Sequence, residues 1–523
     1  MSGEKIVMST MNASRRLFLR HAGMMSAIGA AGGPLALNLS AIGTASAQTA
    51  ADYKAIVCLF LFGGNDSINM VLPTDAASFA NYTTLRSQAP DPIALLAAGT
   101  AANAGAANGS PARLGGVLPI APTNAQGRSF ALHPAMGTLQ TMFDTDKRLA
   151  ILPNVGTLIL PTSKTQYGQA SHPKPVSLFS HNDQQNTWQS FQPEGATVGW
   201  GGRMGDLLAS MNSRAVFTSI TAGGNAVWLS GNEVRQYQVT SNGAIRLGTN
   251  ASGQVYGSAA VGQAMERIVQ TTRGGHLLEM DLSAVAARSM QAESLLRNAL
   301  KPASDPLFGT APASGTSYNA NNDPKLRYTD PNNPGTTIAN PLAQQMQVVA
   351  RIIEASGNAD VGAKRQVFFV SLGGFDTHDA QNNNHAQLMA RLAHALRYFD
   401  DTLGALGLRN QVTTFTASDF GRTFTSNGDG TDHGWGAHHF VMGGAVRGGD
   451  FYGSFPVYGA KNANNNNFDS SPDQLGNGAL LPTTSVDQLG ATLGRWFGLS
   501  DTQLLDVFPN LANFSTRNLG FMT

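Results

Sequence analysis

The sequence has 523 residues, of which 42% are apolar and 13% are charged, so the chain can bury a sizeable core beneath a weakly charged surface. The formal net charge of +1 excludes the electrostatic attraction that nucleic-acid binding requires, and we expect no nucleic-acid partner. The only cysteine, Cys58, excludes an internal disulfide and lies in an apolar run, where we expect a buried thiol.

Residues 1–47 have the pattern of a twin-arginine signal peptide. Arg15 and Arg16 stand in the stretch SRRLFLR, a weakly apolar run follows over 22–41, and the small residues ASA precede the expected cleavage point. The run is short and interrupted by Gly-Gly-Pro, so we expect no transmembrane anchor after processing. We therefore expect recognition by the twin-arginine export machinery and a periplasmic or secreted mature chain, 48–523.

Apolar runs rich in β-branched and aromatic residues predict four buried strands, at 56–62, 149–156, 366–376 and 411–421. Apolar residues at helical spacing over 385–406 predict a helix between the last two strands. A strand–helix–strand unit favours a parallel sheet, so we predict an α/β fold.

Three polar stretches do not have the pattern of a core. Residues 97–127 are rich in Ala, Gly and Asn, residues 301–340 in Pro, Asn, Ser and Gly, and residues 461–478 in Asn. We interpret them as insertions on the surface of a single domain that spans 48–523.

A carboxylate follows three of the predicted strands: Asp66 in GGND, Asp376 in GGFDTH and Asp419 in SDFGR. The carboxyl ends of parallel strands share one edge of the sheet, and this edge is where ligands bind. His378 stands two residues after Asp376, so both side chains point to the same side of an extended strand end. Carboxylates and imidazoles together are typical ligands of Zn or Mn, although a lone Asp-x-His is more often a turn with a capping Asp.

The stretch GTDHGWGAHHFVMGG, residues 430–444, contains three of the eleven histidines. We predict a loop that folds back over the sheet edge, so that Asp432 and His433, with His439 as a further candidate, join the three strand-end carboxylates at a divalent cation. His438 is expected to point away, because neighbouring side chains on a strand or loop diverge. The alternative interpretation of the whole stretch is a solvated loop.

A second stretch, SLFSHNDQQNTWQ, suggests a nucleophile. Ser180 stands at a predicted helix start, where a nearby dication would lower the pKa of its hydroxyl; the alternative is an ordinary N-cap serine. Arg203 in GWGGRM and Arg422 after SDFG are candidates for binding the oxyanion of a substrate, or plain salt-bridge residues.

Eight motifs in order along the chain, LFGGNDSINMVLP, LHPAM, SHNDQQNTW, GWGGRM, LGGFDTH, SDFGRT, NGDGTDHGWGAHHFVMGG and VFPNL, resemble the DUF1501 family of exported bacterial proteins. That family is similar to the alkaline phosphatase and sulfatase superfamily. The resemblance implies a three-layer α/β/α sandwich with a mostly parallel central sheet and a divalent-metal site at the carboxyl edge of that sheet.

By position, the resemblance implies that Ser180 matches the nucleophile. It also implies metal ligands at Asp66, at Asp376 with His378, at Asp419, and at His433 or His439. The sequence departs from the pattern at Phe420, where those phosphatases have His, so one ion or none is compatible with it rather than a full pair.

The function that this resemblance implies is a metal-dependent hydrolase of phosphate or sulfate esters, with a small-molecule or polymeric substrate. Two alternatives stay open from the sequence. The low charge and the long Asn- and Gly-rich loops are also typical of a non-catalytic envelope protein that binds or assembles, and the metal site could serve unrelated chemistry.

Overall fold

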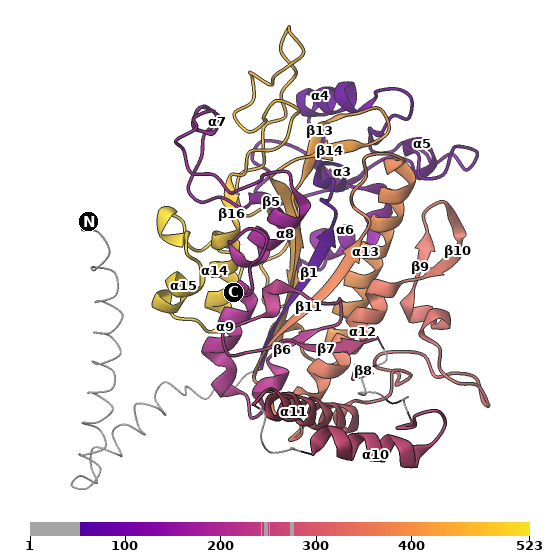
Figure 1. Cartoon of the computed structure of the whole chain (residues 1–523). Coiled ribbons are helices and arrows are strands. Elements are labelled where there is room, and N and C mark those ends of the chain that lie inside the picture. Colours follow the sequence, from indigo (N-terminus) through magenta and orange to yellow (C-terminus); the bar gives the residue numbers. More distant parts are fainter. Residues whose placement is uncertain (1–52, 242, 245–248, 250–251, 272–276) are drawn as a thin grey trace, which may run out of the picture. The chain divides into compact units, whose positions relative to one another are not determined.

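The structure, a computed structural model, describes residues 53–241, 243–244, 249, 252–271 and 277–523, and the predicted export signal lies outside them. Within these residues a nine-stranded sheet forms the centre of the fold (Figure 1). Its strands, in spatial order, are β16 (Thr484–Ser485), β5 (Leu149–Gly156), β15 (Ala437–Gly443), β12 (Val412–Ser418), β1 (Lys54–Phe62), β11 (Arg365–Gly373), β6 (Ser219–Thr221), β7 (Tyr237–Thr240) and β8 (Gly243–Ala244).

The sheet is mostly parallel, as predicted. β1 pairs in parallel with β11 and with β12, and β11 pairs in parallel with β6. β15 is antiparallel to both of its neighbours, β12 and β5, and its apolar run Phe-Val-Met gives it the composition of a buried strand. All four strands predicted from the sequence are present. The prediction of a loop over 430–444 was wrong, because β15 and part of a small hairpin occupy that stretch.

Side chains of β1 alternate between two apolar cores, one on each face of the sheet. Helices that contribute to the first core are α6 (Gly137–Asp144), α12 (Pro341–Glu354) and α13 (Gln381–Ala405). Helices that contribute to the second are α8 (His181–Ser190), α9 (Trp200–Leu208), α14 (Val486–Phe497) and α15 (Asp501–Val507). The fold is therefore a three-layer α/β/α sandwich.

The three polar stretches contain little regular structure. Residues 97–127 include α5 (Pro111–Leu114) and β3 (Leu118–Ile120), which joins β4 (Phe130–Leu132) and β2 (Val71–Pro73) in a small sheet. Residues 301–340 include the hairpin of β9 (Arg327–Asp330) and β10 (Asn333–Ala339), and residues 461–478 contain no helix or strand.

The remaining described helices are α3 (Ser67–Met70), α4 (Ala76–Arg86), α7 (Lys164–Tyr167), α10 (Ala259–Gln270) and α11 (Leu277–Ala299). Among the helices of the described residues, none is long and apolar enough to cross a bilayer.

A second hairpin lies at the end of the sheet toward which the arrow of β1 points (Figure 1). It consists of β13 (Arg422–Ser426) and β14 (Thr431–His433). Gly430 lies where this hairpin packs against the backbone of Thr377 and His378, and a Cβ atom there would meet both carbonyl oxygens. The hairpin therefore seats tightly on the segment that follows β11.

Candidate metal centre

Neighbouring strand ends bring Asp376 and Asp419 together at the carboxyl edge of the sheet. Asp376 follows β11 and Asp419 follows β12, with β1 between these strands. The turn after β1 begins at Gly63, whose φ of +114° and close contact with the backbone N of Asp376 leave no room for a Cβ atom. The Gly63 N–H donates to both carboxylate oxygens of Asp419 at 3.2 Å. Both acids are therefore fixed beside the end of the central strand.

Three imidazole Nε2 atoms surround the carboxylate of Asp376. The Nε2 atoms of His378 and His433 lie 3.2 and 3.4 Å from its Oδ1, and the Nε2 of His181 lies 3.4 Å from its Oδ2. The Nε2 atoms of His378 and His433 are 2.9 Å apart. Two ligands bound tetrahedrally to one Zn²⁺ ion are separated by roughly 3.3 Å, so these distances have the size expected for a shared ion.

The Nδ1 atom of each imidazole already has an acceptor. His181 Nδ1 lies 2.7 Å from Oδ2 of Asp419, His433 Nδ1 lies 2.6 Å from the carbonyl oxygen of Phe179, and His378 Nδ1 lies 3.3 Å from Oδ1 of Asp432. Because carboxylates and carbonyls only accept, each Nδ1 carries the hydrogen and each neutral ring presents a lone pair at Nε2. Metal-binding histidines are oriented in this way by an acceptor on the far ring nitrogen.

Among the described residues, no hydrogen-bond donor outside the three rings is bonded to these Nε2 atoms. The Nε2 of His181 is buried without a hydrogen-bond partner, and the facing Nε2 atoms of His378 and His433 are both acceptors when the rings are neutral. In the described part of the chain, the ligand atoms of His181, Asp376 and His433 all lie within 4.8 Å of one another. The donor set of three imidazoles and one carboxylate therefore fits a divalent cation of the Zn type.

Arg422 compensates the charge of Asp376. Its Nη1 atom donates to Oδ1 of Asp376 at 2.8 Å, and its Nη2 atom donates to the carbonyl oxygen of Thr431. Burial acts to raise the pKa of Asp376, but the Arg422 guanidinium outweighs it and holds that pKa below its ordinary value. Asp376 is thus an ionised carboxylate that faces the three imidazoles.

The pKa values of His181 and His433 are shifted in opposite directions. The hydrogen bond that His181 donates to Asp419 raises the pKa of His181 despite partial burial. Burial lowers the pKa of His433, although the carbonyl of Phe179 acts in the opposite direction. The Phe420 ring lies against both, with centroids 4.8 Å from His181 and 4.6 Å from His433, and it is 2% exposed. An apolar wall therefore closes one side of the site.

A strained turn delivers His181 and Phe179. Ser177 and Phe179 have positive φ angles of 50° and 75°, which non-glycine residues adopt only when their surroundings require it. The carbonyl of Phe179 holds His433, and α8 starts two residues later at His181. The strained residues therefore lie where this turn contacts the candidate metal centre.

Ser180 occupies the N-cap position of α8 but its side chain makes no capping hydrogen bond. Ser180 therefore stands where the N-cap interpretation places it. Its hydroxyl, however, does not accept a hydrogen bond from the first turn of the helix. Ser180 precedes the candidate ligand His181 directly in the chain, which places its hydroxyl at the same helix end.

Asp66 has a different role from the predicted one. Both of its oxygens accept from the Arg86 guanidinium, at 2.5 and 3.0 Å, and Gln381 Nε2 donates to Oδ2 at 2.6 Å. Asp66 and Arg86 are both fully buried. A carboxylate saturated in this way has no free oxygen for a cation, so the prediction of Asp66 as a ligand is corrected.

Asp419 and Asp432 bind histidines rather than facing the cation position. Asp419 accepts from Gly63, from His181 and, at 2.8 Å, from Gln185 Nε2. Asp432 is an exposed residue whose Oδ1 faces His378. We therefore correct both from ligands to residues that orient ligands.

The three histidines of residues 430–444 lie on two different strands. His433 ends β14 and joins the metal centre, whereas His438 and His439 lie inside β15 and are buried. His439 Nδ1 lies 3.3 Å from Thr416 Oγ1, and its ring packs against Trp188, so the prediction of His439 as a ligand was wrong. His438 does point elsewhere, as expected, with Nε2 3.0 Å from the hydroxyl of Tyr458.

Neither predicted oxyanion-binding arginine is free. Arg203 donates to the carbonyls of Val507 and Ser190, and Ser190 ends α8 at the opposite end from His181. Arg422 is 1% exposed and holds Asp376. In the described chain both side chains thus bind groups of the protein itself, and for Arg422 this agrees with the salt-bridge alternative.

His181 was not among the candidate ligands predicted from the sequence. A signal was present in HNDQQ, where His181 and Gln185 stand four residues apart and so share one helix face. Both side chains contact Asp419 from that face.

The family described as "Protein of unknown function (DUF1501)" matches residues 53–508. The chain belongs to this family. No curated protein matches this DUF1501 chain.

Two solved structures are similar to it at low identity. The crystal structure of Ps i-CgsB in complex with k-i-k-neocarrahexaose is 8% identical, with a TM-score of 0.33, over 90% of this chain and 77% of that one. A structure described as BT33494S-sulf, from work on glycosaminoglycan metabolism by Bacteroides thetaiotaomicron, is 11% identical, with a TM-score of 0.31, over 86% and 74%. These similarities are too low to assign a function to the chain.

Proposed function

We propose that this DUF1501 protein is a hydrolase of phosphate or sulfate esters that uses one divalent cation held by His181, His378, His433 and Asp376. One observation carries the proposal: three imidazole Nε2 atoms lie within 3.4 Å of the ionised carboxylate of Asp376, while every Nδ1 is bound to an acceptor. When bound, such a cation would lower the pKa of a hydroxyl or water and offset charge on the leaving oxygen.

The chain supplies the remaining parts of the proposed site. Asp419 keeps His181 in the tautomer that presents Nε2, and Arg422 keeps Asp376 ionised. Phe420 covers the imidazoles with an apolar ring, which limits access of water from that side. Ser180, with its hydroxyl outside any cap, is the proposed nucleophile.

The donor set favours Zn²⁺ or a similar transition-metal ion. Three imidazole nitrogens with one carboxylate suit Zn or Mn better than Mg or Ca, whose sites are built from oxygen. The pairing of Asp66 with Arg86 favours one ion rather than two, because a fixed guanidinium already neutralises the acid that would help to hold a second.

Replacing Ser180 with alanine should lower ester hydrolysis by about 100-fold or more, since the nucleophile would be lost. The assay compares the Zn-loaded parent and variant on para-nitrophenyl phosphate and para-nitrophenyl sulfate. Ser470→Ala, in an exposed loop, is the matched control and should keep full activity. Absence of hydrolysis of both esters by a folded, Zn-loaded parent would reject the hydrolase and favour the non-catalytic envelope role.

We further propose export by the twin-arginine machinery, on the strength of the N-terminal pattern. Replacing Arg15 and Arg16 together by lysine should abolish secretion, because the machinery reads the arginine pair and not its charge. Fractionation of cells that express the parent and the variant measures this. Equal secretion of both, or secretion of the parent by cells that lack the machinery, would contradict the proposal.

A further inference from the structure

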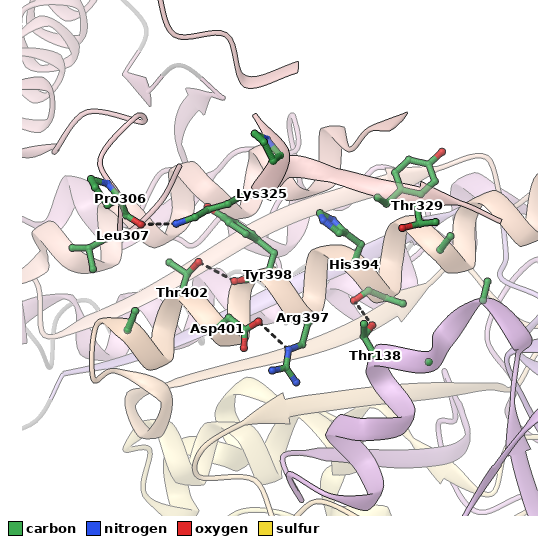
Figure 2. A pocket seen from close by; sticks show the side chains of 17 residues that line it. Thr138, Pro306, Leu307, Lys325, Thr329, His394, Arg397, Tyr398, Asp401 and Thr402 are labelled. Carbon is green, nitrogen blue, oxygen red and sulfur yellow. Dashed lines mark hydrogen bonds and ion pairs between the residues drawn. The ribbon is translucent and has the colours of Figure 1, made fainter. Parts of the chain in front are cut away.

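A groove runs along α13 and is lined by none of the residues of the candidate metal centre (Figure 2). It has a volume of about 580 Å³ and lies between α13, the start of α6 and the segment 306–329. Small residues of α13, Ala390, Ala393 and Ala405, form part of its lining, and Leu307 adds to an apolar wall. The volume lies within the range of pockets that hold small molecules.

His394 presents one defined hydrogen-bond donor in this groove. The Asn340 side chain caps α12, where its Oδ1 accepts from the backbone N–H of Leu342, so its Nδ2 is the atom that faces His394 Nδ1 at 3.1 Å. His394 Nδ1 must therefore accept, and the hydrogen of the neutral ring is on Nε2. Burial lowers the pKa of His394 to about 4, so the ring is neutral at neutral pH.

Lys325 supplies a positive charge at the rim. Its ammonium donates to the carbonyl of Pro306 at 2.5 Å, and among the described residues no carboxylate pairs with it. The other charged residues of the groove are already paired, since Arg397 donates to Asp401 at 2.9 Å (Figure 2). The groove therefore offers one fixed donor and one available cation over an apolar lining.

We propose that this groove binds an elongated apolar monocarboxylate, such as a medium-chain fatty acid. The carboxylate accepts from His394 Nε2–H, the Lys325 ammonium attracts it from the rim, and the alkyl chain covers the alanines of α13. A cationic amphiphile of equal length lacks both interactions. The site is separate from the proposed ester hydrolysis and uses none of its residues.

The test is isothermal titration of the purified full-length protein with decanoate and with decyltrimethylammonium. Decanoate should bind at one site and the cation should not. His394→Phe should weaken decanoate binding about 10-fold or more, because a donor to a charged acceptor is lost. Lys325→Gln should weaken it about 2- to 5-fold, as expected for an exposed charge.

Two further variants keep the test decisive. Thr138→Trp places a large ring at the exposed rim of the groove and should abolish binding, while its melting curve reports on folding. Lys364→Gln removes an exposed lysine that does not line the groove and should bind decanoate as the parent does. Equal binding of the cation, or parent-like binding by both His394→Phe and Thr138→Trp, would overturn the proposal.

Discussion

Replacing His181 with alanine should lower the affinity of the protein for Zn²⁺ about 10-fold or more, and His433→Ala should do the same. Loss of an orienting residue alone costs about 10- to 100-fold, and a lost ligand should cost at least as much. His181 is the sharper test, because its Nε2 is buried and has no hydrogen-bond partner among the described residues. Isothermal titration of the demetallated protein with Zn²⁺ and Mn²⁺ measures the effect.

Two variants complete that experiment. His172→Ala removes an imidazole whose Nε2 faces Thr162 outside the centre, and it should bind the ion as the parent does. Asp419→Asn should weaken binding less than His181→Ala, because it changes the acceptor that orients a ligand and not the ligand. Parent-like affinity in both His181→Ala and His433→Ala would mean that these histidines do not hold an ion.

The sequence patterns predicted the scaffold of the site better than its ligands. Strand ends at Asp376 and Asp419 follow from apolar runs that stop at glycine or serine, and parallel strands must place such ends at one edge. His378 follows from its spacing to Asp376. Each of these residues closely follows its strand in the chain, so a local sequence pattern is enough to predict its position.

The remaining assignments depend on contacts that no local pattern contains. Asp66 ends a buried strand just as Asp376 does, but Arg86, at the end of α4, reaches it across 20 residues. His433 and His439 share one glycine-rich stretch, but an antiparallel strand between β5 and β12 takes His439 into the core. His181 reaches Asp376 and Asp419 from the start of α8, which follows the strained turn at Ser177 and Phe179.

These contacts also change the electrostatic argument for a cation. Three ionised carboxylates at one edge would repel one another, and a dication would relieve that repulsion. In the structure Arg86 compensates Asp66, Arg422 compensates Asp376, and Asp419 accepts from His181 and two further donors. The case for an ion rests instead on the imidazoles, whose Nε2 lone pairs face one another without donors.

Replacing Arg86 with methionine should lower the free energy of unfolding by about 3–5 kcal/mol, because a buried carboxylate would lose its partner. Burial acts to raise the pKa of Asp66, but Arg86 outweighs it and holds that pKa below its ordinary value. The parent therefore has this stabilisation above the unfolded pKa and loses it as pH falls through the folded one. Urea unfolding should show the largest difference near neutral pH, and a smaller one below about pH 4.

Two comparisons separate this pairing from metal binding. Arg495→Met breaks an exposed pair with Asp501 and should cost under about 1 kcal/mol, so a large loss in Arg86→Met reflects burial and not charge alone. The double variant Asp66→Leu with Arg86→Met should recover much of the loss, since both buried charges are gone. If Zn²⁺ restored the stability of Arg86→Met but not of the double variant, Asp66 would be able to hold a cation, and the guanidinium would stand where a second ion fits.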